Sequence, residues 1–208
     1  TASLEEVVVT ATRREESLQQ VPVSMTALSG SDLQSRGISG FADLTKTAAG
    51  LYLNQSEGAV GTQLRMRGVG ARPNTPIDSA VGVLQDDVYQ VRPGFSFQEM
   101  QDVERVEVLR GPQGTLFGKN TTSGVIKITT NSPDLEEFGG NVQGVGGNYG
   151  NVEARGVLNI PIIEGELAAR ISGFNATRDG YTDNHFNDEE TRSMDRHGGR
   201  AKLRWDAS

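Results

Sequence analysis

Two segments near the C-terminal end of the chain alternate between apolar and polar residues, and this alternation restricts the fold more than any other feature. They span residues 166–177 and 200–205. Because successive side chains of a β-strand point to opposite faces, each segment would form a strand with one apolar and one polar face. The apolar positions are Leu167, Ala169, Ile171, Ala201, Leu203 and Trp205, and they alternate with Ala168, Arg170, Ser172, Arg200, Lys202 and Arg204.

The connections around these strands alternate in length. Two more strands are predicted at 138–147 and 151–160, a short turn at 161–165 leads into the third strand, and the connection at 178–195 is long and polar. Outer-membrane barrels combine a polar interior with short periplasmic turns and long external loops. The pattern thus predicts four strands of such a barrel, with 178–195 outside the cell and Trp205 near the periplasmic rim. A soluble meander with one long loop is the alternative that alternation alone leaves open.

Composition limits what the rest of the chain can be. Glycine accounts for 26 of the 208 residues, and each glycine costs a helix interior about 1 kcal/mol relative to alanine. We therefore expect short strands and turns. The net charge is −7, and the arginines are scattered apart from a modest cluster near Arg192–Arg204, which argues against a nucleic-acid partner. The absence of cysteine excludes disulfides and cysteine-based zinc sites.

No pattern indicates catalysis, a cofactor or a resident metal. Gly118 and Lys119 are followed by Asn120, and Gln113 stands where a phosphate-binding loop would need its first glycine. The histidines, His185 and His197, both lie in or beside the long polar connection. We expect a protein that is not an enzyme, with no cofactor and no metal.

The middle of the chain, residues 21–133, predicts one compact α/β domain. A strand is expected around 21–25, followed by a helix capped by Ser29 or Ser31 that stops at Gly37, and a second helix capped by Ser39 that stops at Gly50. Four more strand-like segments follow, each bounded by Gly, Pro, Asn or Asp: 63–67, 81–89, 103–109 and 124–130.

Five segments of the chain, taken together, resemble the TonB-dependent outer-membrane receptors, and they occur in that family's order. Residues 103–118 (VERVEVLRGPQGTLFG) and 119–130 (KNTTSGVIKITT) are similar to its plug signature. Residues 64–70 (LRMRGVG) resemble its arginine–glycine strand end, and 81–89 (VGVLQDDVY) resemble its next strand and turn. Residues 6–11 (EVVVTA) resemble the TonB box.

The resemblance implies an α+β plug domain followed by antiparallel transmembrane β-barrel strands. It divides the chain into a TonB box and periplasmic tail at 1–20, a plug at 21–133 and the first four barrel strands at 134–208. Receptors of the family have 22 strands, and four cannot close. We therefore expect an incomplete barrel, a fragment that is not transport-competent by itself.

The resemblance also assigns roles to residues. The box, Glu6, Val7, Val8, Val9, Thr10 and Ala11, would bind TonB by adding a strand to its sheet. The pairs Arg67–Gly68 and Arg110–Gly111 would contact the barrel, where the family's arginines meet glutamates. In this chain alone, pairing of Arg67 and Arg110 with Glu104, Glu107 or Asp87 is the preferred alternative. The plug loops that would face the ligand contain Arg72, Asn74, Tyr89 and Arg92.

The implied function is energy-coupled uptake of a scarce ligand, most often a ferric siderophore in this family. The implied partners are TonB with its inner-membrane energising complex, outer-membrane lipid and the ligand, but no nucleic acid. The implied location is the outer membrane of a Gram-negative cell, with plug and tail facing the periplasm. A soluble ligand-binding or interaction domain that shares the plug fold is the competing hypothesis.

Overall fold

A computed structural model describes residues 8–9, 16–17, 23–54, 63–70, 79–90, 100–184 and 189–207. The chain divides into two compact units, Thr1–Thr130 and Asn131–Ser208. The boundary predicted from the sequence, between residues 133 and 134, lies a few residues further along. Each unit has its own sheet.

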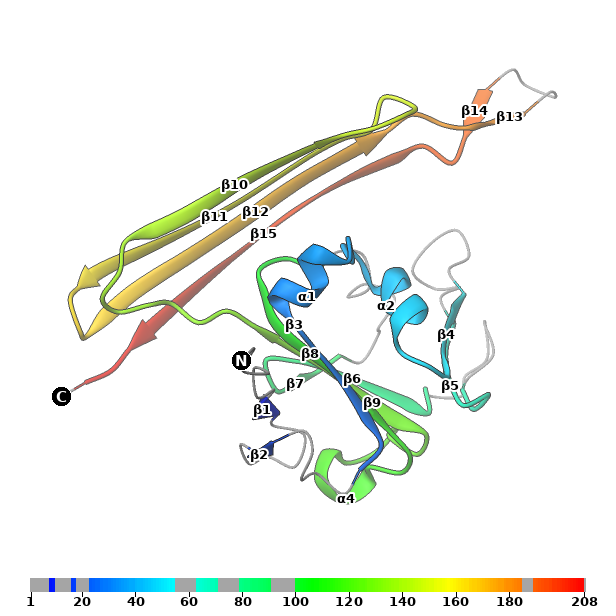
Figure 1. The fold of residues 1–208 in the computed structure, drawn as a ribbon, viewed down its shortest axis with the longest axis horizontal. Coiled ribbons are helices and arrows are strands. Elements are labelled where there is room, and N and C mark those ends of the chain that lie inside the picture. The colour runs from blue at the N-terminus through cyan, green and yellow to red at the C-terminus, as the bar shows by residue number, and fades with distance from the viewer. Residues whose placement is uncertain are drawn as a thin grey trace, which may run out of the picture. The chain divides into compact units, whose positions relative to one another are not determined.

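The first unit is built on a five-stranded mixed sheet (Figure 1). Its strands lie in the order β3 (Met25–Ser29), β8 (Val103–Arg110), β9 (Gly124–Thr130), β6 (Val81–Gln85) and β7 (Val88–Tyr89). Strands β6 and β9 are parallel, and the other neighbours are antiparallel. The predicted strand 81–89 is in fact two strands, because Asp86 and Asp87 adopt positive φ angles of 48° and 64° and turn the chain between them.

Helices cover both faces of this sheet. Helices α1 (Gly30–Ser35) and α2 (Phe41–Thr47), with the hairpin of β4 (Leu51–Asn54) and β5 (Gln63–Met66), pack on the larger apolar cluster. Helix α4 (Gly114–Phe117) places Phe117 against a smaller cluster with Leu84, Leu109 and Val125. In Figure 1, α1 and α2 lie on one side of the sheet and α4 near its other end. Burying these side chains supplies the main stabilisation of the unit.

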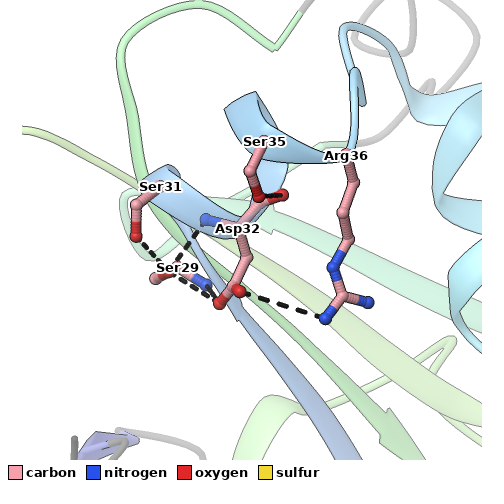
Figure 2. Close-up of polar contacts among 5 residues, drawn as sticks. All are labelled: Ser29, Ser31, Asp32, Ser35 and Arg36. Atoms are coloured by element: carbon pink, nitrogen blue, oxygen red, sulfur yellow. Dashed lines mark hydrogen bonds and ion pairs between the residues drawn. The ribbon is translucent and has the colours of Figure 1, made fainter.

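Helix α1 begins at a reciprocal cap, drawn in Figure 2. The Ser29 hydroxyl accepts a hydrogen bond from the Asp32 amide at 3.1 Å, and the Ser29 amide donates to Asp32 Oδ2 at 3.1 Å. Arg36 Nη2 lies 3.9 Å from Asp32 Oδ1 one turn later. Of the two caps that the sequence allowed, the structure uses Ser29, and Gly37 ends the turn with φ 63°.

The predicted cap of α2 was wrong by one residue. Gly40 is the N-cap, not Ser39. Glycine has no side chain that could accept a bond from the first turn, and the Asp43 amide donates instead to the Gly40 carbonyl at 3.1 Å. Asp43 Oδ2 in turn accepts bonds from the amides of Ser39 and Gly40 at 3.4 Å each. Gly50, with φ 78°, follows the helix as predicted.

The second unit is a four-stranded antiparallel meander. Its strands are β10 (Gly139–Gly146), β11 (Val152–Ile163), β12 (Leu167–Arg178) and β15 (Met194–Trp205), which pair in chain order. They lie side by side in Figure 1. All four correspond to predicted strands. Strand β11 runs further than predicted, to Ile163, and its register with β12 shifts between Pro161 and Ile163.

The long connection between β12 and β15 holds a small hairpin. Strand β13 (Thr182–Asn184) pairs antiparallel with β14 (Glu189–Thr191). This hairpin was not predicted from the sequence. The connection at the opposite end of the meander, between β11 and β12, is a short turn closed by a hydrogen bond from the Glu166 amide to the Ile163 carbonyl at 3.0 Å.

The meander has one apolar and one basic face. Residues directly opposite in a ladder share a face, and Leu158, Ile171 and Ala201 form one such row. On the same face Val142, Leu203 and Trp205 are 88%, 74% and 74% exposed. Strands of 12 residues extend about 40 Å, which is long enough to cross the apolar band of a membrane.

Candidate functional site

The plug-like unit brings together the two arginine–glycine pairs that the sequence singled out. Arg67 and Gly68 form the tip of a tight turn, with φ angles of 51° and 80°. Reciprocal hydrogen bonds join the backbones of Met66 and Val69, at 2.9 and 3.0 Å. Positive φ at both central positions is the signature of a two-residue hairpin turn. Arg67 is therefore an exposed residue at the end of β5.

Arg110 reaches the same place from β8. Its Nε donates to the Ala49 carbonyl at 2.9 Å, and its Nη2 donates to the Thr26 hydroxyl. The Arg67 amide donates to the Gly50 carbonyl at 2.8 Å. Both arginines thus converge on the turn that follows α2. Burial, together with the neighbouring positive charge of Arg67, lowers the pKa of Arg110.

The predicted pairing of these arginines with nearby carboxylates was wrong. In the part of the chain that the structure describes, the three candidate carboxylates face other cations. Arg105 contacts Glu104 and lies 3.9 Å from Glu107, while Lys127 lies 2.9 Å from Asp87. The reason is geometric: Glu107 sits directly opposite Lys127 on β9, whereas the Arg110 side chain is held by Thr26 and Ala49.

The segment after Arg110 is fixed by backbone contacts. Gly111 has φ 100°, and its amide donates to the Ser123 carbonyl at 2.9 Å. The Gln113 amide donates to the Thr121 carbonyl at 2.9 Å. These bonds hold α4 between the ends of β8 and β9. The glycine-rich signature therefore describes a tight β–α–β corner rather than a phosphate-binding loop.

The described residues include only Val8 and Val9 of the predicted TonB box. Val8 and Val9 form β1, which pairs antiparallel with Glu16 and Ser17 of β2. Val9 is fully buried. The partner strand comes from the tail itself, not from the sheet of the domain. The other box residues, Glu6, Val7, Thr10 and Ala11, lie outside the described residues.

The predicted ligand-facing loops are mostly outside the described residues as well. Arg72, Asn74 and Arg92 fall in that category. Tyr89 ends β7, where it is partly buried and lies opposite Leu84.

No group of three or more metal-ligating side chains gathers among the described residues. No helix in the described ranges has the length and apolar character needed to cross a membrane.

Comparison with known proteins decides the family. The model of the TonB-dependent receptor plug domain matches residues 17–125, which is more than half of the chain. The chain belongs to the TonB-dependent receptor family. The family match covers the mixed sheet from β3 to β8 and reaches the first residues of β9.

Curated relatives extend the similarity into the meander. The pesticin receptor of Yersinia pestis is 30% identical over 158 residues, which is 76% of this chain and 23% of that receptor. The iron-regulated outer membrane virulence protein of Vibrio cholerae is 33% identical over 147 residues, covering 67% of this chain and 22% of that protein. The chain thus spans about a quarter of the length of the relatives it matches.

A solved structure supports both the plug and the strands. The ferric yersiniabactin uptake receptor FyuA of Yersinia pestis matches with a TM-score of 0.79 and 28% identity, over 87% of this chain and 28% of that one. The fold is accordingly a plug domain followed by antiparallel strands of the receptor barrel, and the four-stranded sheet is not closed. This confirms the fold and the family inferred from the sequence.

Proposed function

We propose that this chain works as the N-terminal part of a TonB-dependent outer-membrane receptor that imports a scarce ligand, with ferric siderophores as the ligand class. The observation that carries the proposal is the combination of a plug fold and 12-residue amphipathic strands in one chain. The relatives named above support the ligand class, since FyuA is a ferric yersiniabactin uptake receptor. The exposed apolar face of the meander argues against a soluble domain.

The proposal also gives the meander, the plug and the tail an orientation relative to the outer membrane. The polar end of the meander, with the β13–β14 hairpin, would lie outside the cell, and the short β11–β12 turn and Trp205 would lie at the periplasmic side. The plug and the tail would then face the periplasm, and outer-membrane lipid would contact the apolar face. The box residues 6–11 would pair with TonB, which links the receptor to the energised inner membrane.

Energy coupling would need the paired form of β1 to open. Only two residues on each side form the β1–β2 ladder, and a backbone hydrogen bond contributes about 0.5–1.5 kcal/mol net. A partner strand that forms more bonds with residues 6–11 could replace this short ladder. The described contacts are therefore compatible with strand addition to TonB.

The test compares two changes at one residue in the complete receptor. Val8→Pro removes the backbone N–H that a strand partner needs, whereas Val8→Ala keeps it. We expect Val8→Pro to abolish binding of the purified TonB periplasmic domain in surface plasmon resonance, and to abolish uptake of labelled ferric yersiniabactin by cells that bind this complex. Val8→Ala should retain both. Full TonB binding by Val8→Pro would refute strand pairing at the box.

A further inference from the structure

The chain enters the meander through a short segment that is bound to one face of the sheet. This face, the basic face, is opposite the apolar face, and its cations include Arg170, Arg200, Lys202 and Arg204. The entering segment consists of residues 134–137, near the beginning of the second unit and just before β10. We call this segment the strap.

The side chain of Asn159, on β11, holds the strap at its first and its last residue. Asn159 Oδ1 accepts a hydrogen bond from the Asp134 amide at 2.9 Å, and Nδ2 donates to the carbonyls of Asp134 and Glu137 at 3.0 and 2.6 Å. Asn159 is only 4% exposed. Its amide group has two N–H donors, and both are used here. Asn159 therefore exchanges both of its bonds with Asp134 as a residue of a paired strand would.

The strap is also folded on itself and tied to the β11–β12 turn. Asp134 Oδ1 accepts hydrogen bonds from the amides of Glu136 and Glu137 at 2.8 and 3.1 Å. The Gly165 amide, in the turn, donates to the Leu135 carbonyl at 3.1 Å. These contacts fix the strap relative to β11 and to the turn that follows it.

Strand β10, which follows the strap, has little in its own sequence that fixes its pairing. Four of its eight residues are glycine, and every residue from Gly140 to Gly146 is exposed. Its valines, Val142 and Val145, point to opposite faces. Register is strongly specified where one face of a strand is buried, and weakly specified in glycine-rich strands. In the described part of the chain, β10 lies at the edge of its sheet and pairs with β11 alone (Figure 1).

The pairing of β10 with β11 is therefore fixed at its two ends. At the far end, the Gly147 amide donates to the Asn151 carbonyl at 2.9 Å and closes the hairpin loop, whose length sets the register there. At the near end, Gly139, the first residue of β10, lies directly opposite Asn159. Because Asn159 also binds the Glu137 carbonyl, it holds the chain just before the strand begins.

We propose that Asn159 is a positioning residue that anchors the strap and thereby keeps the first half of β10 in register with β11. The inference goes beyond the proposed function, because it concerns how the first barrel strand is held, whatever ligand is imported. In a closed barrel the other edge of β10 has to pair with another strand, since unpaired backbone groups are costly in lipid. A β10 that opened or slipped beside Asn159 would present the wrong register to that strand.

The test replaces Asn159 by leucine in the complete receptor in detergent and measures amide hydrogen exchange by mass spectrometry. Leucine is similar in size but neither donates nor accepts a hydrogen bond. Because buried backbone groups lose their partners, peptides covering 134–142 should exchange about tenfold faster. Peptides covering 143–150 and 166–177 should change by less than about twofold. The control Ser172→Ala removes another polar group of the basic face, also 4% exposed, and should leave exchange in the strap unchanged.

Cross-linking measures the register itself, since the chain has no cysteine that would react in the background. In the parent, a short bifunctional methanethiosulfonate should join Asn141→Cys to Val157→Cys, which lie directly opposite each other. It should join Asn141→Cys to Arg155→Cys, two residues out of register, much more slowly. In the Asn159→Leu background the out-of-register reaction should accelerate by the same factor as the exchange, about tenfold.

Unchanged exchange of residues 134–142 in Asn159→Leu would overturn the inference. Faster exchange spread evenly over all four strands would also overturn it, because Asn159 would then contribute only to general stability, and so would an equal effect of Ser172→Ala. If Asn159→Leu does not assemble, the same measurements are made on Asn159→Asp, which keeps an acceptor for the Asp134 amide and loses both donors. Faster exchange confined to the strap and the first half of β10 then supports the inference, and any other pattern contradicts it.

Discussion

Gly124, the first residue of β9, shows how tightly single residues are constrained in the plug. Its φ is 156°, and a Cβ atom there would lie 2.2 Å from Met66 Sδ and 2.3 Å from the Leu109 carbonyl oxygen. Neither neighbour has room to move, since Met66 and Leu109 are both fully buried. Gly114, the first residue of α4, would meet nothing within 4 Å. The two glycines of the same signature therefore differ in what they tolerate.

This contrast gives a prediction for a pair of matched substitutions. Gly124→Ala should destabilise the plug by about 2 kcal/mol or more, because overpacking and backbone strain add. Gly114→Ala should change stability by no more than about 0.5 kcal/mol. Hydrogen exchange of the β8 and β9 amides would measure both. Equal protection in the two variants would show that Gly124 is not needed for close packing.

At the scale of elements, the cap of α1 connects stability to pH. The Ser29 hydroxyl, the Ser29 amide and Arg36 together lower the pKa of Asp32 below 3.8. The folded chain thus binds this proton less tightly than the unfolded chain does. The contribution of Asp32 is therefore fully present above the unfolded value and is lost as the pH falls through the lower folded value.

Removal of the cap should reproduce the acid effect at neutral pH. Ser29→Ala should destabilise α1 by about 1 kcal/mol, and protection of the Arg36 amide, which donates to the Asp32 carbonyl, should fall at pH 7. Gln34→Ala, at an exposed position of the same helix, is the control. Below about pH 3, parent and Ser29→Ala should differ less. A constant difference across this range would contradict the role of Asp32.

Elements with strong local signals could be predicted from the sequence, and elements that depend on partners could not. Strand β9 was predicted with its bounds, because the seven residues from Gly124 to Thr130 are rich in β-branched side chains and are bounded by turn residues. Strand β4, with only Leu51–Asn54, and helix α4, with one turn, were missed because their residues carry weak propensity without the hairpin or corner that contains them. The β1–β2 ladder likewise depends on a pairing between short segments that have no turn signature.

In the candidate site too, features with a local sequence signal could be predicted, and contacts between distant segments could not. Arg67 and Arg110 were expected to contact a barrel or to pair with nearby carboxylates, and their convergence on the turn after α2 was not predicted. The partners of the Arg110 side chain, Ala49 and Thr26, come from segments far away in the sequence. Periodicity cannot report such a contact. The basic face, by contrast, was present in the alternation of β12 and β15 from the start, and only the register between strands was needed to bring Arg170 opposite Lys202.

At the scale of the whole molecule, the two faces of the meander should differ in the free-energy cost of an added charged side chain. Ile171 lies near the middle of β12 on the apolar face and is 49% exposed. Gln143, on β10, lies on the basic face and is exposed. If the apolar face meets lipid, a lysine there should cost about 2–4 kcal/mol near the bilayer midplane, whereas a lysine towards the hydrated interior should cost little.

Ile171→Lys should therefore reduce assembly of the complete receptor in the outer membrane, and Gln143→Lys should not. Assembly is measured as the fraction of receptor in outer-membrane preparations that keeps its heat-sensitive mobility in electrophoresis. Because both variants gain the same side chain on neighbouring parts of one sheet, differences in expression or total charge affect them equally. Similar losses in the two variants would mean that the apolar face does not differ from the basic face in its contact with lipid, which would contradict the assignment of the apolar face to lipid.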